Sequence, residues 1–426
     1  MDNTKDSSFL EALPEAIVQH ILSSVSNARD VSVCSSVCKK WKYSMCHVRR
    51  LYFARNVGDE RERQSDHIVT RMVLSMTALE ELVVYCPFFT GSLLAWLLHS
   101  KHSLKVLELR VDDTGEKRTA NSSMCKLDCI SSSLQLQILR LWGVSLSQPP
   151  SGWRCFKNLH TLEIVGARIR DTALSGILLA CRFLKELTLL GCDGVDSFCF
   201  DLQYLEKCRL DFSGLGDSSI FFVAPMLGFL EIQGAASLLI KGKHSLRHLT
   251  IGNISGKVNK VDVGKLPDLE SLSVRGVHWR WDAIQNLLEC ATEVKEIVMK
   301  VEFCGDREKL EPFPEIDFVK FFSAHQKLQR FDSQGAMFAA LSQRNSLKML
   351  SSTFEIPCLR EAHITVRSPF NADQKLLVLE SLIRCSPLLC KLAIRISQMK
   401  NCEAAADDFF RKMNVLKCTY DVIDVE

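Results

Sequence analysis

Residues 159–189 read LHTLEIVGARIRDTALSGILLACRFLKELTL, and this stretch decides the fold. It begins and ends with the same pattern, Leu-x-x-Leu-x-Leu or Ile, at residues 159–164 and 184–189. The alternating part of each pattern predicts a short strand with one apolar face. Between the two patterns, apolar residues of segment 172–181 recur at helical spacing and predict a helix. The stretch is therefore one strand–helix unit followed by the strand of the next unit.

The same pattern recurs along most of the chain. Consecutive copies start mostly 19 to 25 residues apart, which is the period of leucine-rich repeats. A unit of this size cannot bury its apolar face alone, so neighbouring copies stack and share one core. Eleven copies start at Leu79, Leu104, Leu136, Leu159, Leu184, Leu227, Leu246, Leu269, Val294, Leu359 and Leu389, and a degenerate copy starts at Leu205.

These repeats predict the fold class. We expect an α/β protein with a leucine-rich-repeat solenoid, in which a curved parallel β-sheet carries outer helices. Because a helix is longer than the strand of its repeat, the strands are expected on the concave side. Polar insertions at 112–133 and 305–317 are expected to emerge as loops. The alternative is an α/β core of another kind, from which so many copies in frame are hard to obtain.

Composition restricts the function classes. The net charge of +3 and the pI near 8.1 do not indicate a nucleic-acid or anionic-membrane partner. The chain starts MDNTKDSS, without the basic and apolar regions of a secretory signal, and has no apolar run of membrane-spanning length. We therefore expect an intracellular protein of the nucleus, the cytoplasm or both, whose 18 cysteines are reduced thiols.

Motifs for catalysis and metal binding are missing from the sequence. It contains no C-x-x-C pair, no G-x-S-x-G and no H-E-x-x-H. The glycines of segment 252–257 are one residue short of a phosphate-binding loop, so a turn between repeats is expected there. The sequence predicts no catalytic residue, metal or cofactor. A cysteine-dependent hydrolase is the alternative from the enzyme class.

Residues 9–50 differ in pattern from the repeats. Leu13-Pro14-Glu15 places Pro in the first turn of a helix and Glu where it favours the helix dipole. Asp30 is a predicted N-cap of a second helix, and Cys38 begins a third, CKKWKY. Three helices this short cannot bury their apolar side chains among themselves. The leftover apolar surface indicates a partner protein.

The run L-P-E-x-I-x-x-x-I-L, then R-D-V, then S-V-C-K-K-W at residues 13–41 resembles the F-box motif. F-box segments are three-helix units that dock on the Skp1 adaptor of SCF ubiquitin ligases. The resemblance implies that six residues face the adaptor or support the helix that does: Leu13, Pro14, Ile17, Ile21, Leu22 and Val25. It also implies that Val37, Cys38 and Trp41 close the unit. Ala16 departs from the larger apolar residue of many F-boxes. The alternative is a helical cap on the following fold.

The C-terminal part carries a second resemblance. The segments IPCLREAHITV (356–366) and SPLLCKLAIRI (386–396), with an apolar helix at 375–385 between them, are similar to the FBD-type end segment of plant F-box/LRR proteins. The tryptophan that often precedes that segment is not visible here. The expected organisation is an F-box at 9–50, a linker helix or cap at 51–78, leucine-rich repeats at 79–355 and an FBD-like part at 356–426.

The resemblance implies a non-catalytic substrate-recognition subunit of an SCF ligase. Its partners would be a Skp1-type adaptor, through it a cullin and a RING protein, and a substrate protein held by the repeats. Trp279 and Trp281 alternate just after a strand, so we expect one of them to contact substrate; the alternative is that both cover a neighbouring helix. Two other functions stay open: a repeat scaffold without a ligase role, and an F-box receptor gated by a small ligand.

Overall fold

The computed structural model describes residues 12–55, 62–111, 126–212, 219–253, 258, 260–303, 313–367, 371–396 and 403–425. The chain divides into two compact units. The first unit comprises residues 1–195 and 202–205, and the second comprises 196–201 and 206–426. Most of both insertions that the sequence predicts as loops, and residues 254–257 of the glycine segment with its predicted turn, lie outside the described residues.

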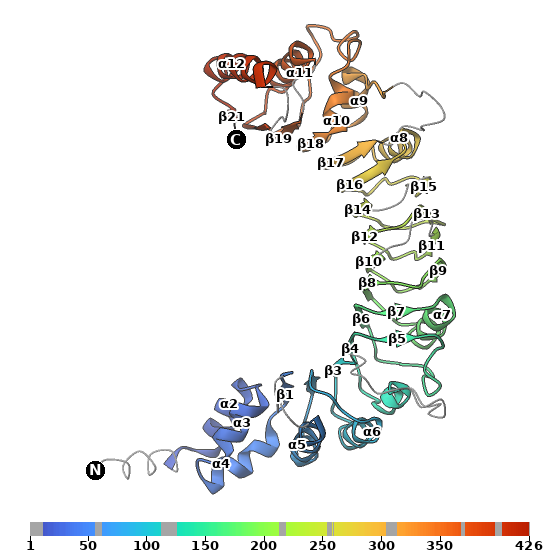
Figure 1. Ribbon diagram of the computed structural model, residues 1–426, viewed down its shortest axis with the longest axis vertical. Helices are drawn as coiled ribbons and strands as arrows, with labels where there is room; N and C mark the ends of the chain where they lie inside the picture. The colour runs from blue at the N-terminus through green and yellow to red at the C-terminus, as the bar shows by residue number, and fades with distance from the viewer. Residues whose placement is uncertain are drawn as a thin grey trace, which may run out of the picture. The chain divides into compact units, whose positions relative to one another are not determined.

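The first unit begins with three helices and continues as a parallel sheet (Figure 1). The helices are α2 (Glu15–Ser24), α3 (Ala28–Ser35) and α4 (Lys39–Ser44), followed by the 3₁₀ turn η1 (Met45–His47). The sheet has the order β1-β2-β3-β4-β6-β8. Its strands are β1 (Arg50–Phe53), β2 (Glu81–Val84), β3 (Val106–Arg110), β4 (Ile138–Trp142), β6 (Thr161–Val165) and β8 (Glu186–Cys192).

Helices and short strands form the connections of the first unit. They are α5 (Glu62–Ser75), α6 (Thr90–His99), the 3₁₀ turn η2 (Asp128–Ser132), α7 (Asp171–Ala180) and the paired strands β5 (Ser145–Leu146) and β7 (Arg168–Ile169). Figure 1 shows α5, α6 and α7 on one side of the sheet. The helix predicted at 172–181 is confirmed, within one residue at each end, as α7.

A ladder of leucines forms the core of this sheet. Leu82, Leu107, Leu139, Leu162 and Leu187 are register partners on five successive strands, and none is exposed. Each is the second leucine of a repeat. Burial of one such side chain is worth about 1.5–3 kcal/mol, and each copy gains it only when its neighbours are present. The predicted stacking of copies is confirmed.

The second unit continues the repeat pattern in a parallel sheet of order β10-β12-β14-β16-β17-β18-β19-β20-β21. Its strands are β10 (Lys207–Phe212), β12 (Phe229–Gln233), β14 (His248–Asn253), β16 (Ser271–Trp279), β17 (Glu296–Phe303), β18 (Arg330–Gly335), β19 (Glu361–Val366), β20 (Lys391–Ile396) and β21 (Ile423–Val425). The degenerate copy at Leu205 does lead into a strand, β10. The α/β leucine-rich-repeat solenoid predicted from the sequence is therefore the fold of the chain.

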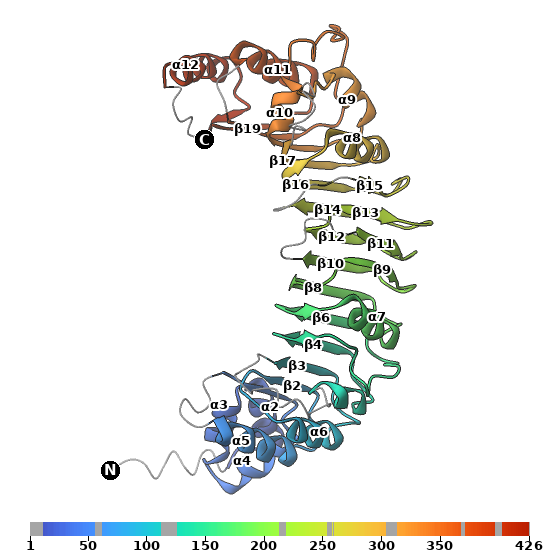
Figure 2. The same cartoon turned by 45° about the vertical axis from the view of Figure 1, so that its right-hand side comes forward.

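Part of the second unit carries strands where outer helices were expected. A second parallel sheet of order β15-β13-β11-β9 lies behind the first (Figure 2). Repeats starting at Leu184, Leu205, Leu227 and Leu246 are 21, 22, 19 and 23 residues long, whereas the helix-bearing repeats at Leu159 and Leu269 have 25. The shorter connections form the extended strands β9 (Ser197–Asp201), β11 (Ser219–Val223), β13 (Ser237–Ile240) and β15 (Lys260–Asp262), in which every second side chain is buried.

Helices return on the later connections of the second unit. They are α8 (Trp281–Cys290), α9 (Phe318–Ala324), α10 (Ala336–Leu341), α11 (Ala372–Cys385) and α12 (Glu403–Thr419). The segment that resembles the FBD type therefore consists of alternating strands and helices. In the part of the chain that the structure describes, no helix is both long and apolar enough to cross a membrane.

Three strands of the main sheets were not among the predicted copies: β1, β18 and β21. In β18 the core positions carry Phe331 and Ser333 instead of two aliphatic residues, which hides the pattern. Both side chains are nevertheless buried, at 1% and 0% exposure. Strand β1 precedes Leu79, the predicted start of the array.

Candidate functional site

The three N-terminal helices pack around a small apolar core. Val18, Leu22 and Val31 are completely buried, and the Trp41 ring is 6% exposed. Helix α4, which carries Trp41, contacts both α2 and α3. Leu22 and Trp41, which the F-box resemblance places near the adaptor, therefore support the unit from inside.

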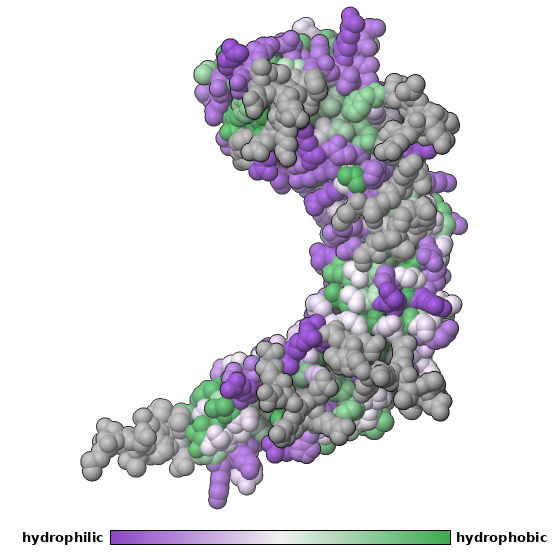
Figure 3. All heavy atoms as spheres, viewed as in Figure 1, coloured by the Kyte–Doolittle hydropathy of each residue, from purple (hydrophilic) through white to green (hydrophobic). Residues whose placement is uncertain are grey.

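Four aliphatic side chains remain at the surface of the same unit. Ile17 and Ile21 on α2 are 45% and 37% exposed, and Val33 on α3 and Val37 just after it are 62% and 45% exposed. Ile17 and Ile21 are spaced i, i+4, which places them on one face of α2, and Val37 lies two residues beyond the end of α3. Figure 3 shows hydrophobic surface over these helices beside hydrophilic residues. We call these four residues the exposed aliphatic face.

The other predicted adaptor residues lie near the start of α2 and the ends of the helices. Pro14 is the exposed N-cap of α2, and its carbonyl accepts hydrogen bonds from the backbone of Ile17 (3.0 Å) and Val18 (3.2 Å). Leu13 is half-buried, and its carbonyl accepts a hydrogen bond from Lys40 Nζ. Val25 and Cys38 are half-buried at helix ends. The sequence did not single out Val33, although its i, i+4 spacing to Val37 is visible there.

The predicted N-cap of the second helix was wrong. Asn27, not Asp30, caps α3: its side-chain oxygen accepts a hydrogen bond from Arg29 N at 2.9 Å. Asp30 lies in the first turn, where its charge still favours the helix dipole. The helix begins earlier because the carbonyl of Asn27 also accepts a hydrogen bond from Val31 N at 3.0 Å.

The two tryptophans predicted to contact substrate have different surroundings. Trp279 is completely buried and its Nε1 donates to the Arg275 carbonyl at 3.0 Å, so it is a core residue and that expectation was wrong for it. Its position at the end of β16, just before α8, turns the ring inward. Trp281 is half-buried, with its ring edge-on to Phe303 at 5.7 Å. Only Trp281 retains surface for a contact.

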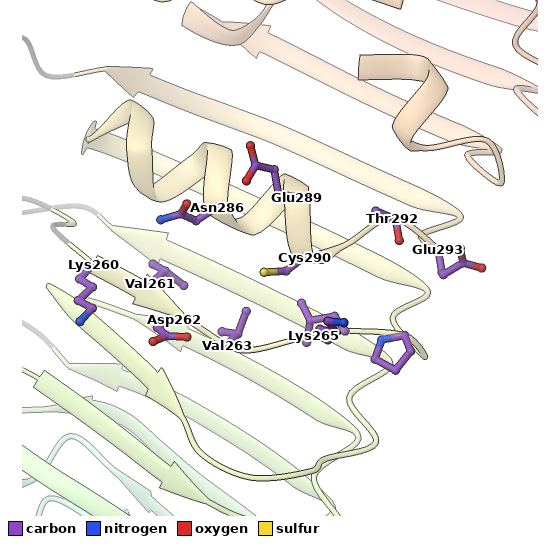
Figure 4. Close-up of a pocket in the computed structure, with 12 residues that line it drawn as sticks. Lys260, Val261, Asp262, Val263, Lys265, Asn286, Glu289, Cys290, Thr292 and Glu293 are labelled. Carbon is purple, nitrogen blue, oxygen red and sulfur yellow. The ribbon is translucent and has the colours of Figure 1, made fainter. Parts of the chain in front are cut away.

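A groove in the second unit has a volume of about 590 Å³ and lies between β15 and α8 (Figure 4). Lys260 and Asp262 come from the strand, and Glu289 and Cys290 from the helix. Burial and the nearby carboxylates of Asp262 and Glu289 raise the pKa of the Cys290 thiol. A thiol beside two carboxylates is the opposite of an activated nucleophile.

The other cysteines with shifted pKa values behave in the same way. Burial raises the pKa of Cys86 to about 11 and the pKa of Cys181 and Cys208 further. The described cysteines are all free thiols. Among the described residues, no group of three His, Cys, Asp or Glu side chains could hold a metal ion. The exposed aliphatic face therefore remains the best-defined candidate site.

Comparison with known proteins bears on the three N-terminal helices and on the whole chain. A family model described as F-box-like matches residues 10–54, the three helices and β1. The chain is 47% identical to the F-box protein At1g10780 of Arabidopsis thaliana over 413 residues, which cover 95% of the chain and 98% of that relative. The chain belongs to the plant F-box protein family. This F-box protein is also 21% identical, over 315 residues, to the F-box/LRR-repeat protein At1g67190 of the same plant, with 70% and 73% of the two chains covered.

Proposed function

We propose that this F-box protein is the substrate-recognition subunit of an SCF-type ubiquitin ligase and that its exposed aliphatic face binds a Skp1-type adaptor. The observation that carries the proposal is the exposure of four aliphatic side chains on the three N-terminal helices, whose other aliphatic side chains are mostly buried or half-buried. The four are Ile17, Ile21, Val33 and Val37. Exposed apolar side chains gathered on one small unit are typical of a protein interface. A few such anchors can carry most of the binding energy.

The start of α2 adds a second part to this interface. Pro14 fixes the first turn of the helix, and Lys40 of α4 holds the Leu13 carbonyl. The hydrogen bond from Lys40 to the Leu13 carbonyl thus connects the start of α2 to α4, and Pro14 stays exposed. In this proposal the adaptor covers Pro14 together with the exposed aliphatic face, while Leu22 and Trp41 keep that surface in shape.

Such a subunit positions the substrate protein and catalyses no bond formation itself. The adaptor connects it to a cullin and a RING protein with its conjugating enzyme, and the repeats hold the protein to be ubiquitinated. Holding both partners raises the effective concentration of a substrate lysine near the loaded ubiquitin. Trp281 is one candidate contact for substrate. The complex would act inside the cell, in the nucleus, the cytoplasm or both.

The test is co-purification of the full chain with a Skp1-type adaptor. We expect the two proteins to elute together, and the double variant Leu13→Ala, Pro14→Ala to lose a large part of the adaptor. A double variant at exposed residues of the second unit, Met349→Ala with Leu388→Ala, is the control and should keep the adaptor. Separate elution of the unaltered chain and the adaptor at micromolar concentration would overturn the proposal and leave a repeat scaffold.

The enzyme alternative has its own test. Iodoacetamide labelling followed by mass spectrometry of the folded chain should modify Cys86, Cys181 and Cys208 slowly, because burial raises the pKa of each thiol. Exposed Cys155 and Cys390 provide the internal reference. A buried cysteine that reacts faster than these two at neutral pH would support a cysteine-dependent enzyme instead.

A further inference from the structure

The strands of the first unit present a second face, opposite to the leucine ladder. In β4, Leu139 and Leu141 point into the core, and the alternate residues Ile138, Arg140 and Trp142 point outward. Trp142 is the register partner of Val165, which is the partner of Leu190. Half-buried apolar and aromatic side chains on this face include Tyr52, Tyr85, Ile138, Trp142, Val165 and Leu190. We call these six residues the aromatic strand face.

The charged side chains at the centre of this face are paired with one another. Glu108 is only 8% exposed and accepts hydrogen bonds from Trp142 Nε1 (3.0 Å), Arg140 Nη1 (3.4 Å) and the Tyr85 hydroxyl. Arg140 Nε also lies 3.3 Å from Glu163 Oε2. Burial and the hydrogen bond to Glu108 raise the pKa of Tyr85, so its hydroxyl stays protonated. The three charged side chains at the centre, Glu108, Arg140 and Glu163, are therefore paired within the sheet.

The aromatic rings are held in fixed positions. Tyr85 packs edge-on to Tyr52 with ring centroids 5.6 Å apart, and to Trp142 at 6.5 Å. Rigid Tyr and Trp side chains lose little entropy on binding, and they are the residues most enriched at the centres of protein interfaces. The rings are thus prepared to meet apolar side chains.

The strand face of the second unit has a different chemistry. Arg330 lies 3.3 Å from Glu296 and 3.9 Å from Glu361 on the neighbouring strands, and Lys300 lies 3.0 Å from Asp332. Paired charges from β17, β18 and β19 thus lie at outward positions of this unit. The cluster of Tyr and Trp rings is not repeated on these three strands.

The aromatic strand face is also joined directly to the F-box. Tyr52 N donates to the Ser26 carbonyl at 2.8 Å, and Arg50 Nη2 donates to the Ser23 carbonyl at 3.2 Å. Helix α3 packs against β1, as Figure 1 shows. A segment bound beside Tyr52 would therefore lie at a fixed position relative to the exposed aliphatic face, which transfer by proximity requires.

We propose that the aromatic strand face binds an uncharged segment of the target protein that is rich in apolar and aromatic side chains. This inference rests on the proposed function and names the chemistry of its substrate. Because the central charges are already paired, the aromatic and aliphatic side chains are left to make the contacts, and they suit an apolar, uncharged segment. A charged segment would have to give up its hydration to cover these apolar side chains.

The test uses the full chain in complex with the Skp1-type adaptor. The probe is a library of phage-displayed random twelve-residue peptides, from which binders are selected and measured singly by fluorescence anisotropy. The variant Val165→Lys, Leu190→Lys places two cations on the aromatic strand face without touching the core. The matched control, Gln233→Lys with Thr250→Lys, makes the same change at outward, half-buried strand positions of the second unit.

We expect uncharged peptides with several apolar or aromatic residues to be enriched, and their affinity to fall at least tenfold in the face variant but not in the control. Enrichment of acidic or basic peptides, equal binding by the face variant, or no enrichment would overturn the inference. So would a dimer of the unaltered complex in analytical ultracentrifugation that the face variant dissociates, because a second copy would then cover this face. The adaptor stays bound in all these cases; its loss from the unaltered chain would instead refute the proposed function.

Discussion

The exposed aliphatic face allows a quantitative prediction for the double variant Ile17→Ala, Ile21→Ala. Full burial of an isoleucine is worth about 1.5–3 kcal/mol, so covering the remaining 45% of Ile17 and 37% of Ile21 is worth roughly 1 kcal/mol each. The double variant should therefore lose about 2 kcal/mol of adaptor binding. That loss corresponds to a roughly 30-fold higher Kd, because about 1.4 kcal/mol is a factor of ten.

The assay is titration calorimetry of the purified chain with a Skp1-type adaptor. Leu98→Ala is the control, because Leu98 on α6 is 51% exposed and lies outside the helices that would meet the adaptor. Its Kd should match that of the unaltered chain. Thermal unfolding of the double variant should shift to a lower Tm, because more than half of each isoleucine side chain is already buried in the folded chain. The titration is therefore run well below that Tm. A Kd that rises less than about threefold in a folded double variant would refute the assignment of this face.

Three further predictions concern the stability of the second unit. Ser333 Oγ is buried without a hydrogen-bond partner among the described residues, so Ser333→Ala should raise the urea midpoint by an amount equivalent to about 1 kcal/mol; a lower midpoint would show a missed partner. Gly276 has φ +105° and a Cβ there would lie 1.7 Å from the Asn253 carbonyl oxygen, whereas Gly242 has φ +85° and open space. Gly276→Ala should therefore cost about 3 kcal/mol or more and Gly242→Ala only about 1 kcal/mol, and equal shifts in Tm would contradict the close approach. Burial lowers the pKa of His325, so the folded unit binds fewer protons than the unfolded chain and should lose stability as the pH falls below about 6.5. In His325→Gln the Tm should depend less on pH between 7 and 5, and an unchanged dependence would exclude this histidine as the cause.

Much of the fold could be predicted because the repeat signal is local. Each Leu-x-x-Leu-x-Leu copy specifies its own strand, and a copy as degraded as the one at Leu205 still leads into β10. The prediction of strands and helices failed where a residue occupies a position that its type does not usually occupy. Ser333 occupies a core position in β18, and the outer connections near Phe200 and Phe222 form strands whose rings stack at 4.9 Å. The general repeat pattern does not specify whether the connection of a given repeat forms a helix or a strand.

The F-box was predictable at the level of the motif and less so at the level of single residues. Ile21 and Leu22 are adjacent and chemically alike, yet Ile21 is 37% exposed and Leu22 is completely buried. Helical periodicity gives an apolar stripe, but it does not say which edge of the stripe meets the other two helices. Trp279 shows the same limit, because alternation with Trp281 could not tell which ring turns into the core.

The amino-acid order by itself determined the repeat, its strands and the three short helices at the N-terminus, because these depend on residue spacing within one or two turns or strands. The tertiary structure alone decided which apolar side chains stay in water. It also brought Tyr85, Glu108 and Trp142, from three different repeats, into one hydrogen-bonded group. The physical reason is that spacing specifies how a segment divides into two faces, whereas burial and charge pairing depend on neighbours that lie 23 to 34 residues away along the chain.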